Sequence, residues 1–155
     1  MSAAVPFPSV AWFSRLAERM TADRNRQIQL GYVDCVARFT VLKGGPDGRD
    51  WSADVSFEEF GVTDVSEPKP DQAARADFAL EADLGTWRAM IESIASGGGR
   101  PDLEHTLNRL SHTGSPMFLR SDDVLRADLY FRFNQSLQEF VNASAQFTTS
   151  FPART

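Results

Sequence analysis

The segment Ala76–Gly99, ADFALEADLGTWRAMIESIASGGG, changes its hydrophobic period partway along its length. Its first part alternates, which is typical of a strand with one buried face. The apolar side of this alternation consists of Phe78, Leu80 and Ala82. The second part has helical spacing, with apolar residues at Trp87, Met90, Ile91 and Ile94. The pattern therefore predicts a strand that runs directly into an amphipathic helix, which stops at the glycines 97–99.

Two stretches upstream have the same alternating character. Residues 33–41 place an apolar side chain at every second position, and residues 51–57 repeat the pattern. The residues between them, KGGPDG at 43–48, are typical of a turn. The two stretches therefore predict an antiparallel hairpin with one solvated face. We expect a short strand at 62–65 and a loop at 66–75, where two prolines interrupt any periodicity.

The remaining periodic segments predict helices. Ser9 can cap a helix whose apolar face begins at Val10 and ends at Met20, and we expect a turn in the polar run 21–27. Asp102 can cap a short helix, and residues 117–120 form a brief strand.

A final helix, the longest one predicted, begins at Ser121, Asp122 and Asp123. Its apolar stripe consists of Leu125, Leu129, Phe133, Leu137, Phe140 and Phe147. Because strands and helices are partly segregated along the chain, the fold class is α+β. We expect a single domain over residues 1–155, with its core at about 10–147.

The composition argues against several classes of partner. The net charge is −5 and the pI is about 5.0, which disfavours nucleic acid and anionic membranes, because both bind cationic surfaces. No apolar run approaches the ~20 residues that span a bilayer, and the first residues do not resemble a signal peptide. Cys35 is the only cysteine, so no intramolecular disulfide can form, and we expect a buried, inert thiol. The expected location is cytoplasmic.

Residues that could support catalysis or bind a metal do not form a recognisable pattern. His105 and His112 lie outside any ligand motif, and the glycines 97–99 lack the lysine of a phosphate-binding loop. Asp34 is the one acid considered for proton transfer, although a surface ion pair with Arg38 explains it better. We therefore predict no catalytic residue, no metal site and no cofactor.

The order of these elements resembles the sterol-carrier-protein-type domain, also called the nonspecific lipid-transfer domain. In that family an Ala-Asp pair opens an alternating strand that runs into a helix ending at glycine, as Ala76, Asp77 and Gly97 do here. The resemblance continues outward through NRQIQL, the hairpin VDCVARFTVL and WSADVSFEEF, and the closing GSPMFLRSDDVLRADLYFRFNQSL. It covers most of the chain from Val10 to Phe147.

The resemblance implies a five-stranded, mostly antiparallel sheet covered on one face by helices, with an apolar tunnel between them. The tunnel would hold a fatty acid, an acyl-CoA or a sterol without covalent chemistry. The residues expected to line it are Trp87, Met90, Ile94, Leu107, Leu110, Phe118, Leu129, Phe133, Leu137 and Phe140. Arg126, which interrupts the apolar stripe of the last helix, could contact an acidic head group.

The leading hypothesis is therefore a non-catalytic carrier for a hydrophobic small molecule, as a monomer or homodimer without stable membrane insertion. One alternative is a small cone-shaped α+β enzyme, similar to ketosteroid isomerase, with Asp34 as the base. Another alternative is a structural or partner-binding module with a dry core, in which Phe131 marks an oligomer contact.

Overall fold

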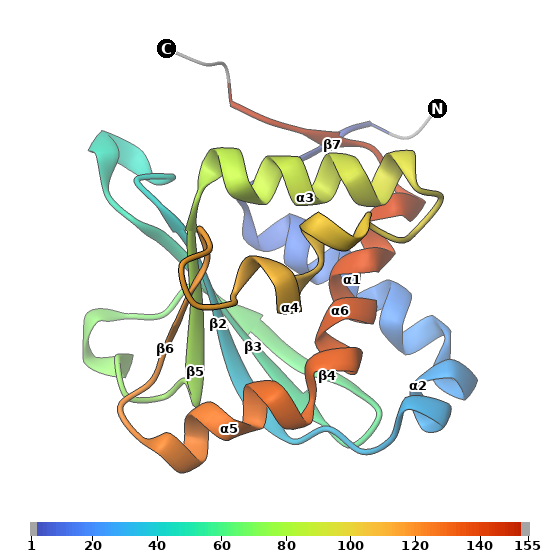
Figure 1. The fold of residues 1–155 in the computed structure, drawn as a ribbon, viewed down its shortest axis with the longest axis horizontal. Coiled ribbons are helices and arrows are strands. Elements are labelled where there is room, and N and C mark those ends of the chain that lie inside the picture. The colour runs from blue at the N-terminus through green and yellow to red at the C-terminus, as the bar shows by residue number, and fades with distance from the viewer. Residues whose placement is uncertain (1–2, 153–155) are drawn as a thin grey trace.

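The computed structural model describes residues 3–152, which form a five-stranded sheet with a layer of helices on one side (Figure 1). The strand order is β4-β3-β2-β5-β6. The strands are β2 (Cys35–Leu42), β3 (Trp51–Glu58), β4 (Gly61–Ser66), β5 (Phe78–Asp83) and β6 (Phe118–Arg120). The pair β2–β5 is parallel and the other neighbours are antiparallel. The prediction of a mostly antiparallel sheet in an α+β fold is therefore confirmed.

The inner face of the sheet follows directly from the alternation in the sequence. Phe39 of β2 lies opposite Ala53 of β3 and Leu80 of β5, and all three side chains are fully buried. A shift of one residue in any pairing would turn the apolar side chains of that strand toward solvent. The hydrophobic pattern thus fixes the register.

Helices cover this inner face (Figure 1). They are α1 (Val10–Ala22), α3 (Leu84–Ser96), α4 (Leu107–Leu110) and α6 (Asn134–Asn142), with α2 (Arg24–Leu30) and α5 (Val124–Arg132) toward the lower end in the view of Figure 1. Ser9 caps α1 as predicted, because its hydroxyl accepts a hydrogen bond from the Trp12 N–H at 3.0 Å. Asp83 is both the last residue of β5 and the cap of α3, where its carboxylate accepts from the Thr86 N–H at 2.8 Å. The strand therefore runs into the helix without a loop.

The two ends of the described chain pair with each other, which the sequence patterns do not indicate. β1 (Val5–Pro6) and β7 (Thr149–Ser150) form a parallel two-stranded sheet that lies beside α3 (Figure 1). Phe7, which follows β1, is buried against Trp12 and Trp87. The remaining regular segments are short 3-10 turns: η1 (Pro46–Gly48), η2 (Pro70–Gln72), η3 (Leu103–His105) and η4 (Ala143–Gln146).

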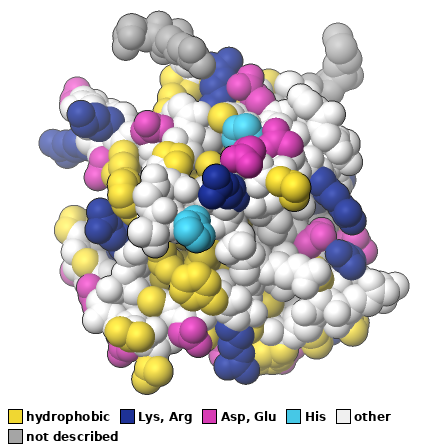
Figure 2. Space-filling view, in the orientation of Figure 1, with side chains coloured by type: hydrophobic (Ala, Val, Ile, Leu, Met, Phe, Trp, Pro, Cys, Tyr) yellow, Lys and Arg dark blue, Asp and Glu magenta, His cyan; other side chains and the backbone are white. Residues whose placement is uncertain are grey.

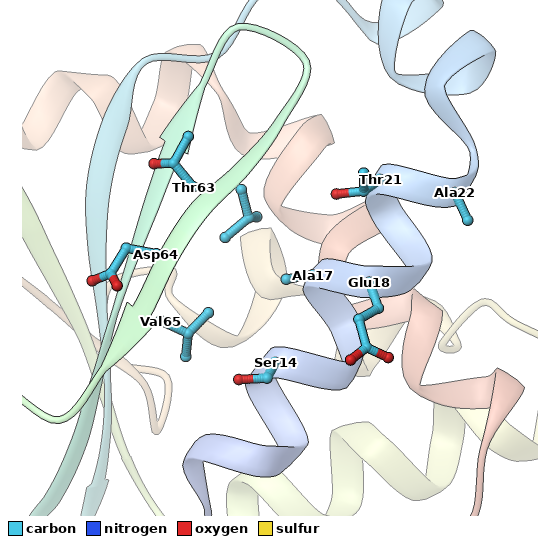
Figure 3. A pocket seen from close by; sticks show the side chains of 9 residues that line it. Ser14, Ala17, Glu18, Thr21, Ala22, Thr63, Asp64 and Val65 are labelled. Atoms are coloured by element: carbon cyan, nitrogen blue, oxygen red, sulfur yellow. The ribbon is translucent and has the colours of Figure 1, made fainter.

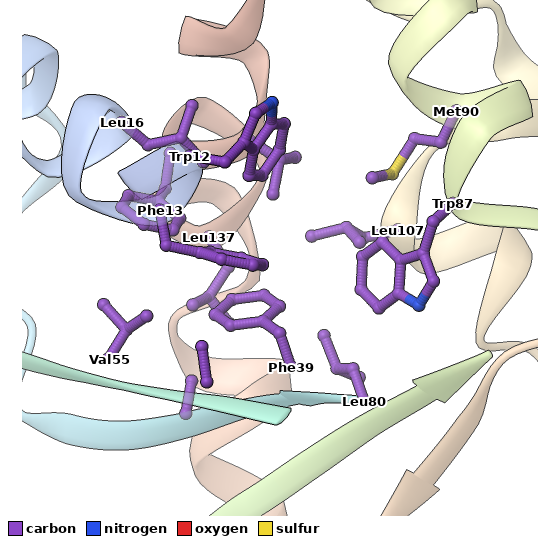
Figure 4. Close-up of a cluster of buried hydrophobic side chains, with 14 of the residues drawn as sticks. Trp12, Phe13, Leu16, Phe39, Val55, Leu80, Trp87, Met90, Leu107 and Leu137 are labelled. Carbon is purple, nitrogen blue, oxygen red and sulfur yellow. The ribbon is translucent and has the colours of Figure 1, made fainter. Parts of the chain in front are cut away.

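The core fills the space between the sheet and the helices, with side chains from α1, α3 and α4 facing those of the strands (Figure 4). Aromatic rings make much of this packing. Phe39 at the centre of the sheet contacts Phe13, Trp87 and Phe140, with ring centroids 5.1 to 6.1 Å apart. The helical layer is thus joined to the sheet mainly through large apolar side chains.

The prediction of one long closing helix is wrong. The helix breaks at Phe133, which ends α5 and precedes α6, and the two helices run in different directions (Figure 1). α5 passes along the lower end of the sheet, whereas α6 crosses the core (Figure 1). A single apolar stripe therefore cannot be buried along both helices. Leu125, predicted to begin the buried stripe, is 80% exposed. In Figure 2 exposed hydrophobic side chains lie at the lower left, over the start of α5.

The first helix ends in the polar run 21–27 as predicted, with a turn at Asp23, but the sequence did not indicate that a second helix, α2, follows at once. Asp23 ends α1 and precedes α2. A tertiary contact holds the short helix in place, since Arg26 donates to the Glu139 carboxylate of α6 at 2.9 Å. Local sequence carries no signal for such a contact.

The outer face of the sheet is polar and is partly covered by the loop 67–77 (Figure 1). Arg38 of β2 forms two hydrogen bonds with the fully buried Asp54 of β3, at 2.7 and 3.0 Å. The same guanidinium donates to the carbonyl oxygens of Gln72 and Ala73 in the loop. The predicted pairing of Arg38 with Asp34 is therefore wrong, because Asp34 precedes β2 and Asp54 lies directly opposite Arg38.

Candidate ligand-binding site

The structure brings most of the predicted tunnel residues together as part of the closed core. Four elements contribute them: α3, α4, α6 and the junction between α5 and α6. The buried members of the predicted set are Trp87, Met90, Ile94, Leu107, Leu110, Phe133, Leu137 and Phe140. Leu129 is partly buried and packs against this cluster. In this structure these side chains pack against one another between the sheet and the helices (Figure 4).

Polar groups among these core residues have internal partners. The Trp87 indole Nε1–H donates to the Thr40 carbonyl oxygen at 2.9 Å, which fixes the ring over β2. The Tyr130 hydroxyl lies 2.7 Å from the Ser111 hydroxyl, and burial raises the pKa of Tyr130 above its ordinary value. These bonds orient the large side chains, and burial keeps the Tyr130 phenol neutral near neutral pH.

Two predicted site residues lie apart from the others. Phe118 is on the edge strand β6 and 46% exposed, with its ring beneath the Arg120 guanidinium. Arg126 donates to the Asp77 carboxylate at 3.1 Å and to the carbonyl oxygens of residues 74–76. Its guanidinium joins α5 to the start of β5, and its hydrogen bonds are made to groups of the protein itself.

An open groove of about 560 Å³ lies between α1 and the edge strand β4 (Figure 3). The α1 wall consists of Ser14, Ala17, Glu18, Thr21 and Ala22, and the β4 wall consists of Val62, Thr63, Asp64 and Val65. Small side chains on α1 recur at Ser14, Ala17 and Thr21, three and four residues apart and so on one face. Because these side chains are short, they do not close the space to β4.

The groove floor continues into the core. Val62 lies opposite Phe57 of β3, and Val65 lies opposite Val55, so both valines extend the inner face of the sheet to its edge. The Phe57 ring contacts the ring of Phe140 at 5.1 Å, and Phe140 leads through Phe39 to Trp87. A row of aromatic rings thus connects the groove to two of the predicted tunnel residues, Phe140 and Trp87.

No local pattern in the sequence indicates this groove. The sequence predicts a short strand at 62–65 but does not indicate that this strand forms an open edge of the sheet. The available signal was the stripe of small residues on α1, which leaves a gap only where the facing strand also has small or β-branched side chains. That condition depends on which strand lies beside α1.

Two acidic residues lie beside the groove, Glu18 on α1 and Asp64 on β4, but Asp64 is opposite Ser56 and its carboxylate points away from α1 (Figure 3). Glu18 lies 3.6 Å from Arg15, and Asp64 lies 2.9 Å from Arg75. Both carboxylates are largely exposed. Hydroxyl groups of Ser14, Thr21 and Thr63 complete the polar lining. The groove therefore offers apolar contact along its floor and hydrogen-bonding oxygens along its rim.

The described residues contain no cluster of three or more His, Cys, Asp or Glu side chains that could hold a metal ion. Among residues 3–152, no helix is both long enough and apolar enough to cross a bilayer. Asp34 is exposed and lies in the segment before β2.

Similarity to known proteins is evident in the fold and not in the sequence. No protein-family model matches the chain, and no curated protein matches it. The solution structure of a conserved hypothetical protein from Thermus thermophilus, described as a candidate sterol carrier protein, is similar with a TM-score of 0.63 at 15% identity, covering 98% of this chain and 96% of that one. A crystal structure of sterol carrier protein 2 is similar with a TM-score of 0.62 at 17% identity. The match covers 89% of this chain and 96% of that one. The order and packing of the elements thus confirm the resemblance at the level of architecture, and the chain has the fold of sterol carrier protein 2.

Proposed function

We propose that this protein is a non-catalytic binding or carrier protein for a hydrophobic small molecule. The ligand enters between α1 and β4 and extends along the aromatic row into the layer between helices and sheet. The observation that carries this proposal is the apolar groove of about 560 Å³ whose floor is continuous with the inner face of the sheet.

The size and chemistry of the groove support such a ligand. Sites for small molecules commonly have volumes of about 300–1,000 Å³ with mostly apolar walls and a few polar groups. Burial of apolar surface stabilises a complex by roughly 25 cal/mol per Å² before the costs of association. Ala17, Val62 and Val65 supply apolar contact at the opening, and Phe57 and Phe140 supply it further in.

The shared fold also supports a binding or carrier function. A sterol carrier protein is among the solved structures similar to this chain over nearly its full length. The predicted tunnel residues on α3, α4 and α6 surround the interior into which the aromatic row leads. We propose that these residues contact the ligand when α1 and β4 separate and the core side chains rearrange.

A structural module with a dry core is the competing function, and the closed packing of Trp87, Met90 and Leu137 favours it. The two functions differ in their response to an apolar probe. A dry module does not bind Nile red, a neutral apolar dye that fluoresces when it leaves water, whereas a carrier binds it saturably.

The test is a Nile red titration of the wild type and two variants of α1. Ala17→Phe fills the groove, while Ala11→Phe places the same ring on an exposed part of the same helix. We expect saturable binding by the wild type and by Ala11→Phe, and a loss of about tenfold or more in affinity for Ala17→Phe. Absence of saturable binding by the folded wild type would leave the dry structural module as the function. Equal affinities for the two variants would place the ligand elsewhere.

A further inference from the structure

We propose that Phe7 is a removable plug of the closed core, and that its withdrawal makes room for the ligand. This inference rests on the proposed function and concerns how access to the interior is controlled. The plug is held by residues 3–7 and 148–151, which pair through β1 and β7 and are called the terminal strap below.

Phe7 lies in the interior but belongs to neither of its two layers. Its side chain is 1% exposed, and its ring centroid lies 4.8 Å from that of Trp12 on α1 and 6.3 Å from that of Trp87 on α3. The other fully buried aromatic side chains among residues 3–152 lie on the five-stranded sheet or on the helices that cover it. Phe7 can therefore leave the core without the displacement of a main strand or a helix.

The terminal strap is a short ribbon at the surface of the helical layer, beside α3 (Figure 1). The Val5 and Phe7 N–H groups donate across it to backbone carbonyl oxygens, both at 2.8 Å. A side-chain hydrogen bond joins it to α1, from the Trp12 Nε1–H to the Thr149 hydroxyl at 3.0 Å. Because a two-stranded ribbon has little stability of its own, the strap opens at a lower free energy than the main sheet.

The strap does not pack closely on α3 along its whole length. A hollow of about 550 Å³ separates part of the strap from the helix, and its lining includes Ile91 on α3 and Thr148 and Phe151 on the strap. Ser144 also lines the hollow and is 2% exposed, and its hydroxyl has no hydrogen-bond partner among the described residues. A buried hydroxyl without a partner is unfavourable, so access of water to this interface offsets part of the free energy of opening.

The space that Phe7 occupies adjoins the inner end of the aromatic row. Phe7 packs against Trp87, the last ring of that row, and against Phe13 of α1, with ring centroids 6.3 and 6.2 Å apart. Protein interiors contain few voids, so a closed core can take up a ligand only if side chains move out. When Phe7 withdraws, Trp87 and its neighbours can shift into the vacated volume and free space above the sheet. Ligand uptake is thereby coupled to release of the strap.

Hydrogen exchange of the wild-type protein tests this release, with 1-dodecanol as the ligand. At saturating 1-dodecanol we expect the Val5 and Phe7 amides to exchange at least about tenfold faster than in the free protein, because their hydrogen bonds across the strap are broken. The amides of β2, the central strand, should stay protected. Ordinary binding without strap release would leave the two strap amides unchanged or slow their exchange.

Two matched truncations test the plug itself. Phe7→Ala should bind 1-dodecanol about tenfold more tightly than wild type, measured by displacement of Nile red, because binding no longer has to remove a ring. Phe78→Ala removes an equally buried ring from β5, where it packs against Tyr130 away from the strap, and should leave the affinity within about twofold. The exchange measurement needs no variant, so it decides the question even if a truncated protein does not fold.

The outcomes separate this inference from the proposed function. If 1-dodecanol binds and the Val5 and Phe7 amides exchange no faster, the strap stays closed and Phe7 is an ordinary core residue of a carrier. A folded Phe7→Ala with wild-type or weaker affinity would overturn the plug in the same way. If neither Nile red nor 1-dodecanol binds wild type, both the function and the plug are wrong.

Discussion

At the scale of single residues, Cys35 shows how burial controls reactivity. Its side chain is buried at the start of β2, and burial, together with the negative charges of Asp77 and Asp34, raises its pKa to about 12. The thiolate is the reactive form, so native protein at about pH 8 should resist a disulfide reagent such as DTNB. We expect rapid labelling only in denaturant, and the absorbance of the released thiol product measures the labelling rate. Fast labelling of native protein would mean that β2 does not face the helices as described.

The same shift has a consequence for stability. Because the folded pKa of Cys35 lies above the ordinary value of 9.0, the neutral thiol stabilises the fold below about pH 9 and this contribution is lost as the pH rises toward 12. In Cys35→Ala, the decline of the unfolding free energy over that interval should be shallower than in wild type.

Arg38 and Asp54 form the one buried ion pair among the described residues. The Asp54 side chain is 0% exposed and that of Arg38 is 16% exposed. Arg38→Met leaves the carboxylate without its partner, and the loss of a partner from such a pair costs about 3–5 kcal/mol. Denaturant melts should show this loss, and faster proteolysis should occur in the loop 67–77, because Arg38 also holds its carbonyl groups.

Two variants serve as controls for that measurement. Arg100→Met removes an exposed guanidinium and should change stability by less than about 0.5 kcal/mol. The double variant Arg38→Met with Asp54→Met should recover much of the loss, because no unpaired charge remains. Equal stability of Arg38→Met and wild type would show that the pair contributes nothing measurable.

At the scale of elements, periodicity predicted those features that depend on one buried face. The alternation around Phe39 and Leu80 fixed two strands of the sheet, and the change of period after Asp83 predicted the passage from β5 into α3. Both are local properties of the sequence. The break at Phe133 was not predictable, because apolar residues continue at helical spacing on both sides of it while the two helices pack on different parts of the fold.

Sequence patterns also indicated most of the interior residues but not the groove. The apolar face of α3 identified Trp87, Met90 and Ile94 as interior residues. The groove arises from two elements far apart in sequence, and its position depends on Ala17 lying beside β4. Periodicity indicates which side chains turn inward, whereas a gap between elements depends on which of them become neighbours.

Arg126 holds α5 against the residues that precede β5. Its guanidinium donates to Asp77 and to three backbone carbonyl groups before β5, and hydrogen bonds to charged groups contribute about 1.5–3 kcal/mol each. We expect Arg126→Met to speed hydrogen exchange in α5 while the central strands stay protected. Arg132→Met, on the exposed side of the same helix, should leave exchange unchanged.

The same variant tests the role that the sequence suggested for Arg126. The Arg126 guanidinium is hydrogen-bonded to Asp77 and to backbone carbonyl oxygens, and it lies outside the groove. Arg126→Met should therefore bind Nile red and 1-dodecanol with wild-type affinity. A selective loss of dodecanoate binding in this variant would instead identify Arg126 as a head-group contact.

At the scale of the whole molecule, the groove and the closed core are two ends of one apolar layer. The groove lies at the β4 edge of the sheet, and Trp87 lies toward the other side, above β2 and β5. The rings of Phe57, Phe140 and Phe39 join them. A ligand with its head at the rim would therefore place its tail toward Trp87, provided that the core side chains move aside.

Bromine quenches tryptophan fluorescence on close approach, so a brominated alcohol can report how deeply the chain is inserted. A protein with Trp12→Phe and Trp51→Phe keeps Trp87 as its only tryptophan. We expect 12-bromo-1-dodecanol, labelled at the tail, to quench Trp87 more strongly than 2-bromo-1-dodecanol, labelled near the head. A matched protein that keeps only Trp12, which is bonded to Thr149 and faces β7, should not distinguish the two compounds. If both compounds bind but neither quenches Trp87, the ligand stays in the outer groove. Trp87 and Phe140 would then be core residues without a part in binding.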